Sequence, residues 1–235
     1  VYADNAATTR MHQTAIDTMT YHLNNTFGNP SSLYTIGQQA KEVLETARAD
    51  MAACFGAQPR EIYFTSGGSE ADNQAITDAV QAAGHVKIDV NAMHIDMLSL
   101  SAHKFHGPKG VGMLYARRGI ILTNLIEGGA QERGKRGGTE NVPGIAAMAA
   151  ALKEACANLD ENSTKVSALR DQLIDGISKI PHCALNGARA PRLPGNVNFC
   201  FEGIEGESLL LLLDAKGISA SSGSACTSGS LDPSH

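Results

Sequence analysis

Lys104 is the residue whose setting in this sequence best suits covalent chemistry. It follows an apolar run of strand length, residues 95–100, and stands beside Ser101 and His103. In an α/β sheet, reactive side chains gather at the carboxyl ends of the strands, so Lys104 is predicted to lie at such an end. Partial desolvation there would make its amine a usable nucleophile, as a Schiff-base lysine requires. The alternative is a solvated lysine in a turn, the ordinary state of lysines, and the rest of the chain has to decide.

Two further features suit a cofactor that carries a phosphate and a ring nitrogen. The turn Gly67-Gly68-Ser69 follows a predicted strand and offers backbone N–H groups to a phosphate. Asp78 could keep a pyridine nitrogen protonated, and with Lys104 these are the groups that a protein supplies to pyridoxal 5′-phosphate. The competing phosphate motifs, Gly-x-x-x-x-Gly-Lys-Ser/Thr and Gly-x-Gly-x-x-Gly, are not in the sequence.

Composition narrows the class of protein. A chain of 235 residues that is 43% hydrophobic with 24 glycines is ordinary for an α/β enzyme of one large or two modest domains. The formal net charge of −5 provides no basic face, so neither nucleic acid nor an anionic membrane is an expected partner. The five cysteines form no Cys-x-x-Cys pair and no metal-ligand spacing, which favours a reducing cytoplasm and predicts no metal site. We also expect no targeting leader and no membrane span, because the longest aliphatic run is residues 209–213.

Hydrophobic periodicity predicts the elements that position these residues. Helices are expected at residues 12–23, 33–55 with Gly56 as the C-cap, 143–159 and 164–180, with residues 160–163 as a loop. Strands are expected at residues 61–65, 85–90, 95–100 and 111–116, and Ser69 as the N-cap of a helix. Residues 126–139 form a long glycine-rich, basic loop of the kind that often carries function, and strand and helix alternate after residue 182.

The pattern breaks between Ile76 and Thr77. The helix after Ser69 has barely two turns before residues 77–84, which resemble the end of a strand that has no beginning. A parallel sheet needs a crossover and a fresh apolar strand at this point. We therefore expect a segment to be missing between Ile76 and Thr77.

The ordered motifs along the chain closely resemble those of one enzyme family. They are residues 4–9 (Asp-Asn-Ala-Ala-Thr-Thr), 28–32 (Gly-Asn-Pro-Ser-Ser), 65–70 (Thr-Ser-Gly-Gly-Ser-Glu), 78–81 (Asp-Ala-Val-Gln), 101–104 (Ser-Ala-His-Lys), 136–141 (Arg-Gly-Gly-Thr-Glu-Asn) and 221–226 (Ser-Ser-Gly-Ser-Ala-Cys). In this order they resemble the cysteine desulfurases of the NifS/IscS type, in the class V branch of fold-type I pyridoxal-phosphate enzymes.

The resemblance implies a role for each matching residue. Lys104 would carry the cofactor, Asp78 would pair with the pyridine nitrogen and Gln81 would contact the ring hydroxyl. The phosphate would be held by Gly68, Ser69, Ser101 and His103, and by Thr139 of a second subunit in a homodimer. Asn29 would lie near the substrate, L-cysteine. Cys226 would accept the sulfur as a persulfide and pass it to an acceptor protein such as an iron-sulfur scaffold, with Lys104 and His103 moving protons.

The sequence around Cys226 suits a nucleophile that has to move between two positions. It lies in a run of Ser and Gly, whose backbone freedom lets a thiol move between a substrate and an acceptor. A structural cysteine would stand among apolar residues, as Cys54, Cys156 and Cys200 do. No Lys or Arg adjoins Cys226 in sequence, so the fold or the substrate has to activate it.

Two departures from the family pattern matter. A histidine stacked on the cofactor ring and an asparagine near it would fall in the missing segment, and an arginine for the substrate carboxylate would lie beyond His235.

The resemblance and the periodicity together predict an α/β, fold-type I chain with a mostly parallel sheet in a large domain (28–142), a smaller α+β domain (143–235), and an N-terminal segment (1–27) that joins the small one. Alternatives are a class V aminotransferase or selenocysteine lyase, and a catalytically silent paralogue that binds sulfur-transfer partners.

Overall fold

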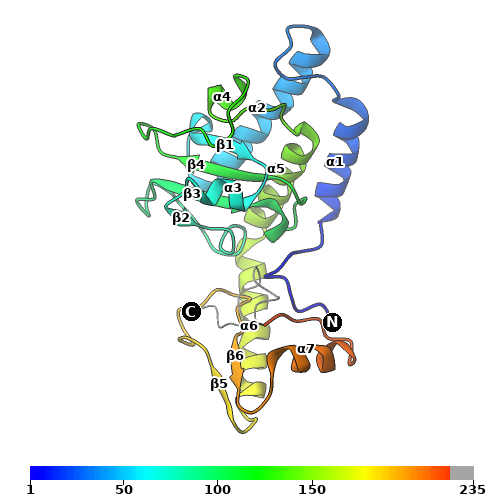
Figure 1. The fold of residues 1–235 in the computed structure, drawn as a ribbon, viewed down its shortest axis with the longest axis vertical. Coiled ribbons are helices and arrows are strands. Elements are labelled where there is room, and N and C mark those ends of the chain that lie inside the picture. The colour runs from blue at the N-terminus through cyan, green and yellow to red at the C-terminus, as the bar shows by residue number, and fades with distance from the viewer. Residues whose placement is uncertain (223–235) are drawn as a thin grey trace. The chain divides into compact units, whose positions relative to one another are not determined.

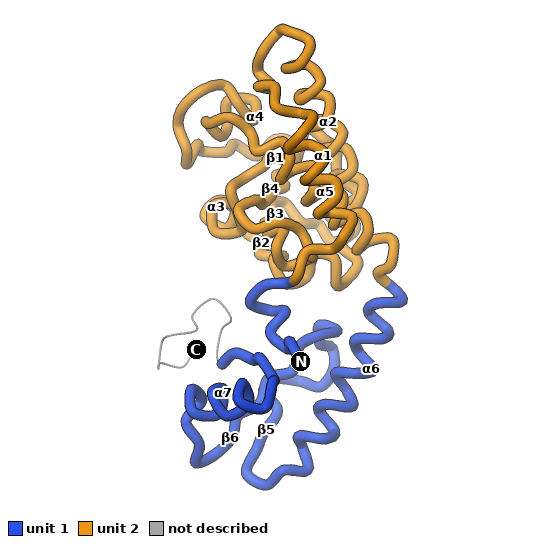
Figure 2. The backbone as a smooth tube through the Cα atoms, turned by 90° about the vertical axis from the view of Figure 1, so that its right-hand side faces the viewer, with its two compact units in different colours: residues 1–9, 160–235 blue, residues 10–159 orange. Residues whose placement is uncertain are grey.

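The computed structural model describes residues 1–222 of the chain (Figure 1). The chain divides into two units, residues 10–159 and residues 1–9 together with the chain from residue 160 onward (Figure 2). Residues 1–9 thus belong to the smaller unit, but the other boundaries differ from those predicted. Residues 10–27 and 143–159 belong to the larger unit, because α1 (Gln13–Asn25) packs against α5 (Val142–Ala157), which packs against α2 (Thr35–Phe55).

A four-stranded sheet in the order β1-β4-β3-β2 forms the centre of the larger unit. Its strands are β1 (Ile62–Thr65), β2 (Thr77–Asp78), β3 (Met97–Ser101) and β4 (Gly112–Ala116). β2 runs parallel to β3, whereas β4 is antiparallel to both β3 and β1. Three strands therefore share one direction and β4 alone is reversed. The sheet is mostly parallel by strand direction, although only one of its three pairings is parallel.

Both faces of this sheet are covered, so β3 and β4 have no exposed residue. Successive side chains of a strand point to opposite faces. Leu98 and Leu100 are accordingly buried in the core that α2 and α5 share, whereas Met97 packs with Leu114 and with Ala71 of α3 (Gly68–Asp72). Complete burial on two faces explains why this strand reads as a nearly continuous apolar run.

Short elements and the smaller unit complete the fold. The larger unit also contains η1 (Pro59–Glu61), η2 (Ala102–Lys104) and α4 (Gln131–Gly134), and the smaller unit contains α6 (Leu159–Ile177, which begins one residue before the boundary), β5 (Cys183–Leu185), β6 (Phe199–Phe201) and α7 (Gly206–Asp214). β5 and β6 pair antiparallel, and Tyr2 forms a parallel bridge with Ser219. Along residues 1–222, no helix is both long and apolar enough to cross a membrane.

Several local predictions are confirmed and others are wrong. Gly56 caps α2 with a left-handed φ of 68°, as predicted. The strand predicted at residues 85–90 is absent, because β2 already occupies the edge of β3 and residues 79–94 form turns instead. The predicted loop at residues 160–163 is the first turn of α6, where its acidic residues suit the positive helix end. Gly67, and not Ser69, is the N-cap of α3, because the helix already begins at Gly68.

Candidate functional site

The carboxyl ends of β1, β3 and β2 meet at one edge of the sheet. Thr65 and Ser101 both pair with Gly112, the first residue of β4, and Asp78 pairs with Ser99. The segments that leave this edge are residues 66–69, 102–104 and 79–81. Together with the strand ends Ser101 and Asp78, they contain most of the predicted site residues. The prediction that Lys104 follows a strand end is therefore confirmed.

Glycines let the turn after β1 approach its neighbours closely. A Cβ atom on Gly68 would lie 3.2 Å from the Ser101 Cβ and 3.2 Å from a methyl carbon of Val80. A Cβ on Gly112 would lie 2.6 Å from the backbone carbon of Gly67, which no real structure tolerates. The structure thus brings Gly68 close to Ser101 and to the turn after Asp78. That Gly68 and Ser101 hold a phosphate stays a prediction. The hydroxyl of Ser69 is exposed at the surface of that turn.

Lys104 is buried in spite of its charge, with only 4% of its surface exposed. It ends η2, and its backbone oxygen accepts a hydrogen bond of 3.2 Å from Nε2 of His85. Burial lowers the pKa of His85, although this bond opposes the shift. The solvated-turn alternative for Lys104 is therefore wrong. Sequence reasoning missed His85, because it lies 19 positions before Lys104 and nothing between the two indicates their contact.

His103 is half-buried next to Lys104. Burial lowers its pKa below the ordinary value, and the positive charges of Lys104 and Lys109 lower it further. Its imidazole is consequently neutral near pH 7 and able to accept a proton. This is the property that the predicted proton-transfer role requires.

Asp78 ends β2 at the same edge, but its carboxylate is exposed. One carboxylate oxygen accepts a hydrogen bond of 2.8 Å from the backbone N–H of Val80, which fixes the turn that leads to the exposed Gln81. Behind this turn, the buried hydroxyl of Ser99 donates to the carboxylate of Asp72 in α3. Sequence reasoning missed the Asp72–Ser99 contact, since both residues look like ordinary polar positions.

Glu70 connects the turn after β1 to the glycine-rich loop. Its carboxylate accepts hydrogen bonds of 2.8 and 2.6 Å from the backbone and hydroxyl of Ser66, and it forms an ion pair of 3.1 Å with Arg136. Burial opposes ionisation, but the hydrogen bonds from Arg136 and Ser66 outweigh it and lower the pKa of Glu70. The loop that carries Thr139 is therefore attached to the turn after β1.

A buried ion pair anchors the other end of this loop. Arg48 of α2 and Glu132 of α4 form two hydrogen bonds of 2.8 Å, and their side chains are 3% and 1% exposed. Glu132 also accepts a hydrogen bond of 3.0 Å from the N–H of Phe64, and Arg48 donates one of 2.8 Å to the carbonyl of Ile62. Glu132 has a left-handed φ of 47°, a conformation that costs free energy in a residue other than glycine. The ion pair holds the loop in this conformation.

Three predicted residues are not brought to this edge by any contact in the described part of the chain. Asn29 is exposed, and its side-chain oxygen accepts a hydrogen bond of 2.9 Å from the N–H of Ser31. Thr139 is exposed on the loop. Cys226 lies outside the described residues. The chain before it is held at Ser221, whose hydroxyl donates a hydrogen bond of 2.7 Å to the carboxylate of Asp4, in the motif of residues 4–9.

The residues at this edge fit one end of pyridoxal phosphate. The turn at Gly68 and the hydroxyl of Ser101 offer donors to a phosphate, Lys104 supplies a buried amine, and Asp78 supplies a carboxylate on the adjacent strand. Fewer side chains are available to contact the face of the ring. Residues 70–77 contain no histidine to stack on it.

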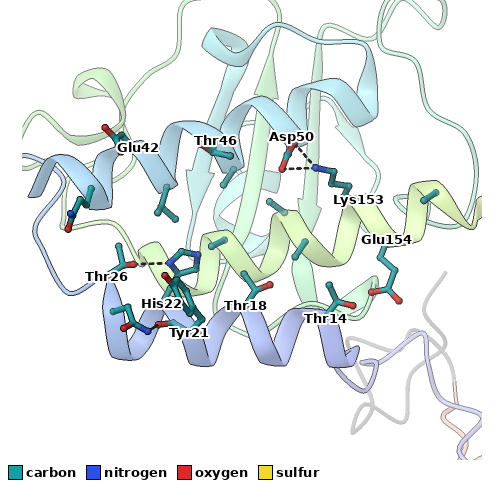
Figure 3. A pocket seen from close by; sticks show the side chains of 18 residues that line it. Thr14, Thr18, Tyr21, His22, Thr26, Glu42, Thr46, Asp50, Lys153 and Glu154 are labelled. Atoms are coloured by element: carbon teal, nitrogen blue, oxygen red, sulfur yellow. Dashed lines mark hydrogen bonds and ion pairs between the residues drawn. The ribbon is translucent and has the colours of Figure 1, made fainter. Parts of the chain in front are cut away.

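A groove of about 1010 Å³ lies elsewhere, between α1, α2 and α5 (Figure 3). Alanines of α5 line it together with polar side chains such as Thr18, His22 and Asp50. It contains none of the predicted site residues. The candidate active site is therefore the sheet edge at Lys104 and not this groove.

Fold and site together define a pyridoxal-phosphate type of enzyme, and the comparisons with known proteins agree. The model of the "Aminotransferase class-V" family matches residues 1–78 and 74–235, so the chain belongs to this family. Within it, the chain is similar to cysteine desulfurases. It is 39% identical to "Cysteine desulfurase IscS" of Methanosarcina thermophila, over all of this chain and 82% of that protein.

Two other relatives agree. The "Cysteine desulfurase" of Gluconacetobacter diazotrophicus is 36% identical, over all of this chain and 83% of that protein. A solved "NIFS-LIKE PROTEIN" superposes with a TM-score of 0.90 at 26% identity, over 99% of this chain and 90% of that one. The predicted family and the fold-type I class are confirmed.

The matches also contain a gap. The alignment with the Methanosarcina protein extends over 330 positions, whereas this chain has 235 residues, so at least 95 positions face no residue here. The family match is broken at residues 74–78, around the junction of Ile76 and Thr77.

Proposed function

We propose that this chain is a cysteine desulfurase that uses pyridoxal 5′-phosphate to take sulfur from L-cysteine. The observation that carries the proposal is Lys104, which is 4% exposed at the end of β3 in a chain similar to cysteine desulfurases over its whole length. A buried amine at a strand end is costly for folding and suits a covalent role. We further propose a cytoplasmic homodimer.

The residues of the sheet edge have separate tasks in this proposal. Bound pyridoxal phosphate would supply the electron sink that labilises bonds at the substrate carbons. Lys104 holds it covalently, and the neutral imidazole of His103 accepts and returns protons next to the amine. Asp78 would pair with the ring nitrogen and Gln81 would contact the ring hydroxyl. Gly68, Ser69, Ser101 and His103 would hold the phosphate, with Thr139 contributed by the second subunit, and Asn29 would help to bind L-cysteine.

Cys226 accepts the sulfur. In the net reaction, L-cysteine and the Cys226 thiol give alanine and a Cys226 persulfide, so the substrate loses one sulfur atom and the thiol gains it. The thiolate is the reactive form, because it attacks the substrate sulfur with a free electron pair. The persulfide is then available to an acceptor protein such as an iron-sulfur scaffold.

We also propose that a segment is missing between Ile76 and Thr77. The broken family match and the 95 unmatched positions support this, and so does β2, a strand of two residues without a crossover before it. A natural molecule with the segment would have a complete ring pocket. A true deletion would favour the second candidate, a silent paralogue that binds sulfur-transfer partners.

Borohydride reduction followed by peptide mapping tests the proposal. If Lys104 holds the cofactor, reduction fixes it on the peptide that contains Lys104. Labelling at Lys109 instead, or no labelling in a yellow preparation, contradicts the assignment. The control is Lys109→Arg, which keeps the charge and leaves the label in place.

Intact mass decides between the two candidates. A mass well above 24.6 kDa supports the missing segment and the desulfurase. A mass of 24.6 kDa, with a colourless protein that releases no sulfide from L-cysteine, supports the silent paralogue.

A further inference from the structure

Two thiols away from the sheet edge lie together on neighbouring helices. Cys54 stands near the end of α2 and Cys156 near the end of α5, and both are half-buried against the core. The desulfurase reaction has no use for either residue. Sequence analysis treated both as small hydrophobes, because 102 positions separate them and no motif connects them.

An ion pair one turn earlier shows how the two helices meet. Lys153 of α5 contacts both carboxylate oxygens of Asp50 in α2, at 3.2 and 3.3 Å (Figure 3). Cys54 follows Asp50 by four residues and Cys156 follows Lys153 by three, spacings that keep a residue on the same helix face. The two helices therefore bring the thiols together one turn beyond the ion pair, and each thiol shifts the pKa of the other.

We propose that Cys54 and Cys156 form a redox-active dithiol that a hydroperoxide oxidises to a disulfide between α2 and α5. Partial exposure lets a small peroxide reach the sulfurs, and contact between the thiols lets the second intercept the oxidised first. An inert pair of core cysteines would instead be fully buried, out of reach of an oxidant.

The two sulfurs have different roles. The neighbouring Cys156 thiol, together with burial, raises the pKa of Cys54, which stays a thiol. The Cys54 thiol lowers the pKa of Cys156, against burial, so Cys156 provides the thiolate. The thiolate is the form that attacks a peroxide.

The oxidation balances with hydrogen peroxide alone. The Cys156 thiolate attacks one peroxide oxygen, the O–O bond breaks and hydroxide leaves, which gives a sulfenic acid. The Cys54 sulfur then attacks the sulfenic sulfur, the S–O bond breaks, and the departing hydroxide takes the Cys54 proton. Two thiols lose two electrons and two protons, and one hydrogen peroxide becomes two waters.

Tryptic mapping tests this directly, because the chain is cut by trypsin in favourable places. Cleavage after Arg48, Arg60, Lys153 and Lys165 leaves Cys54 alone in the peptide 49–60 and Cys156 alone in the peptide 154–165. The full chain is treated with dilute hydrogen peroxide, its free thiols are alkylated under denaturing conditions, and it is digested without reductant.

We expect the two peptides to appear joined, at their summed mass less two hydrogen atoms, and to separate on reduction. The joined species should fall to background in Cys54→Ala and in Cys156→Ala. Cys183→Ser, another half-buried cysteine whose thiol donates to backbone carbonyls, serves as the matched control and should leave it unchanged.

Other outcomes contradict the proposal. Both peptides recovered separately in alkylated form after peroxide treatment would show that the pair does not close. Sulfinic acid on Cys156 with Cys54 still reduced would show that Cys54 does not intercept it. If either alanine variant fails to fold, the map of the unmodified chain decides alone. None of these readouts depends on sulfide release, so the desulfurase proposal can fail without affecting the test.

Discussion

The buried Arg48–Glu132 pair offers a sharp test of how the glycine-rich loop is held. Glu132→Leu removes the carboxylate that accepts two 2.8 Å bonds from Arg48 and one of 3.0 Å from Phe64. The guanidinium, with its side chain 3% exposed, then keeps only the ion pair of 3.2 Å that it forms with the half-exposed Glu45. Removing one partner of a buried pair costs about 3–5 kcal/mol, and the remaining pair with Glu45 places the loss near the lower end of that range, about 3 kcal/mol. The orphaned N–H of Phe64 adds about 1 kcal/mol.

Urea denaturation measures this loss. With a slope of about 2 kcal/mol per molar urea, a loss of about 4 kcal/mol lowers the midpoint by about 2 M. The double variant Arg48→Met/Glu132→Leu should recover more than half of the loss, because it replaces a charged pair with apolar side chains. The carbonyl of Ile62 keeps a donor in that variant, since Arg133 also donates to it at 2.6 Å.

The exposed Lys153–Asp50 pair is the matched control. Lys153 and Asp50 side chains are 65% and 35% exposed, so Lys153→Met should change the unfolding free energy by less than about 0.5 kcal/mol. Two results would refute the reasoning about Glu132: a single-variant loss below about 1 kcal/mol, or a double variant as unstable as Glu132→Leu. Either would mean that the pair does not stabilise the loop.

Three other changes have definite expected outcomes. Gly112→Ala places a Cβ against the Gly67 backbone and should lower the free energy of unfolding by about 1–3 kcal/mol, measured by thermal unfolding. The control Gly176→Ala, which has open space around it, should be neutral or stabilising. Equal losses of stability in the two variants would contradict the close approach of Gly112 to Gly67. The pKa of Glu70 is lowered in the folded state, so its contribution to stability is present above the unfolded pKa of about 4.3 and is lost as pH falls through the lower folded pKa. Glu70→Gln should therefore weaken the pH dependence of the urea midpoint between about pH 5 and pH 3. An unchanged pH dependence would argue against this contribution. Cys226→Ser should keep the yellow colour but release almost no sulfide from L-cysteine, since a hydroxyl is a poor sulfur acceptor; release at the unmodified rate would leave the lyase or aminotransferase alternative.

Local patterns in the sequence predicted the parts of the fold that depend on local physics. The alternation and burial of β3 give an apolar run that ends at Ser101, and the left-handed Gly56 is a cap that few other residues accept. The position of Lys104 followed from these regularities, because a strand end also marks the edge of the sheet.

Contacts between distant segments could not be predicted in this way. Arg48 and Glu132 are 84 positions apart, and each looks like a surface charge in its own segment, so their burial follows only from the packing of the loop on β1. The strand predicted at residues 85–90 failed for a related reason. Its apolar residues Ile88 and Val90 are buried, but the edge of β3 is already paired with β2.

The attachment of Ser221 to Asp4 sets a limit on the range of the Cys226 thiol. Ser219 is held as well, through backbone hydrogen bonds with Val1 and Ala3, so the chain beyond Ser221 starts from a fixed point. Five residues of any chain extend by at most about 18 Å. If Cys226 is the sulfur acceptor, as proposed, it has to meet its substrate within about that distance of Ser221. A short tether of this kind raises the effective concentration of a nucleophile for the targets within its reach. In the proposed enzyme, three residues at the start of the chain, Val1, Ala3 and Asp4, thereby fix the point from which a thiol more than 200 positions away acts.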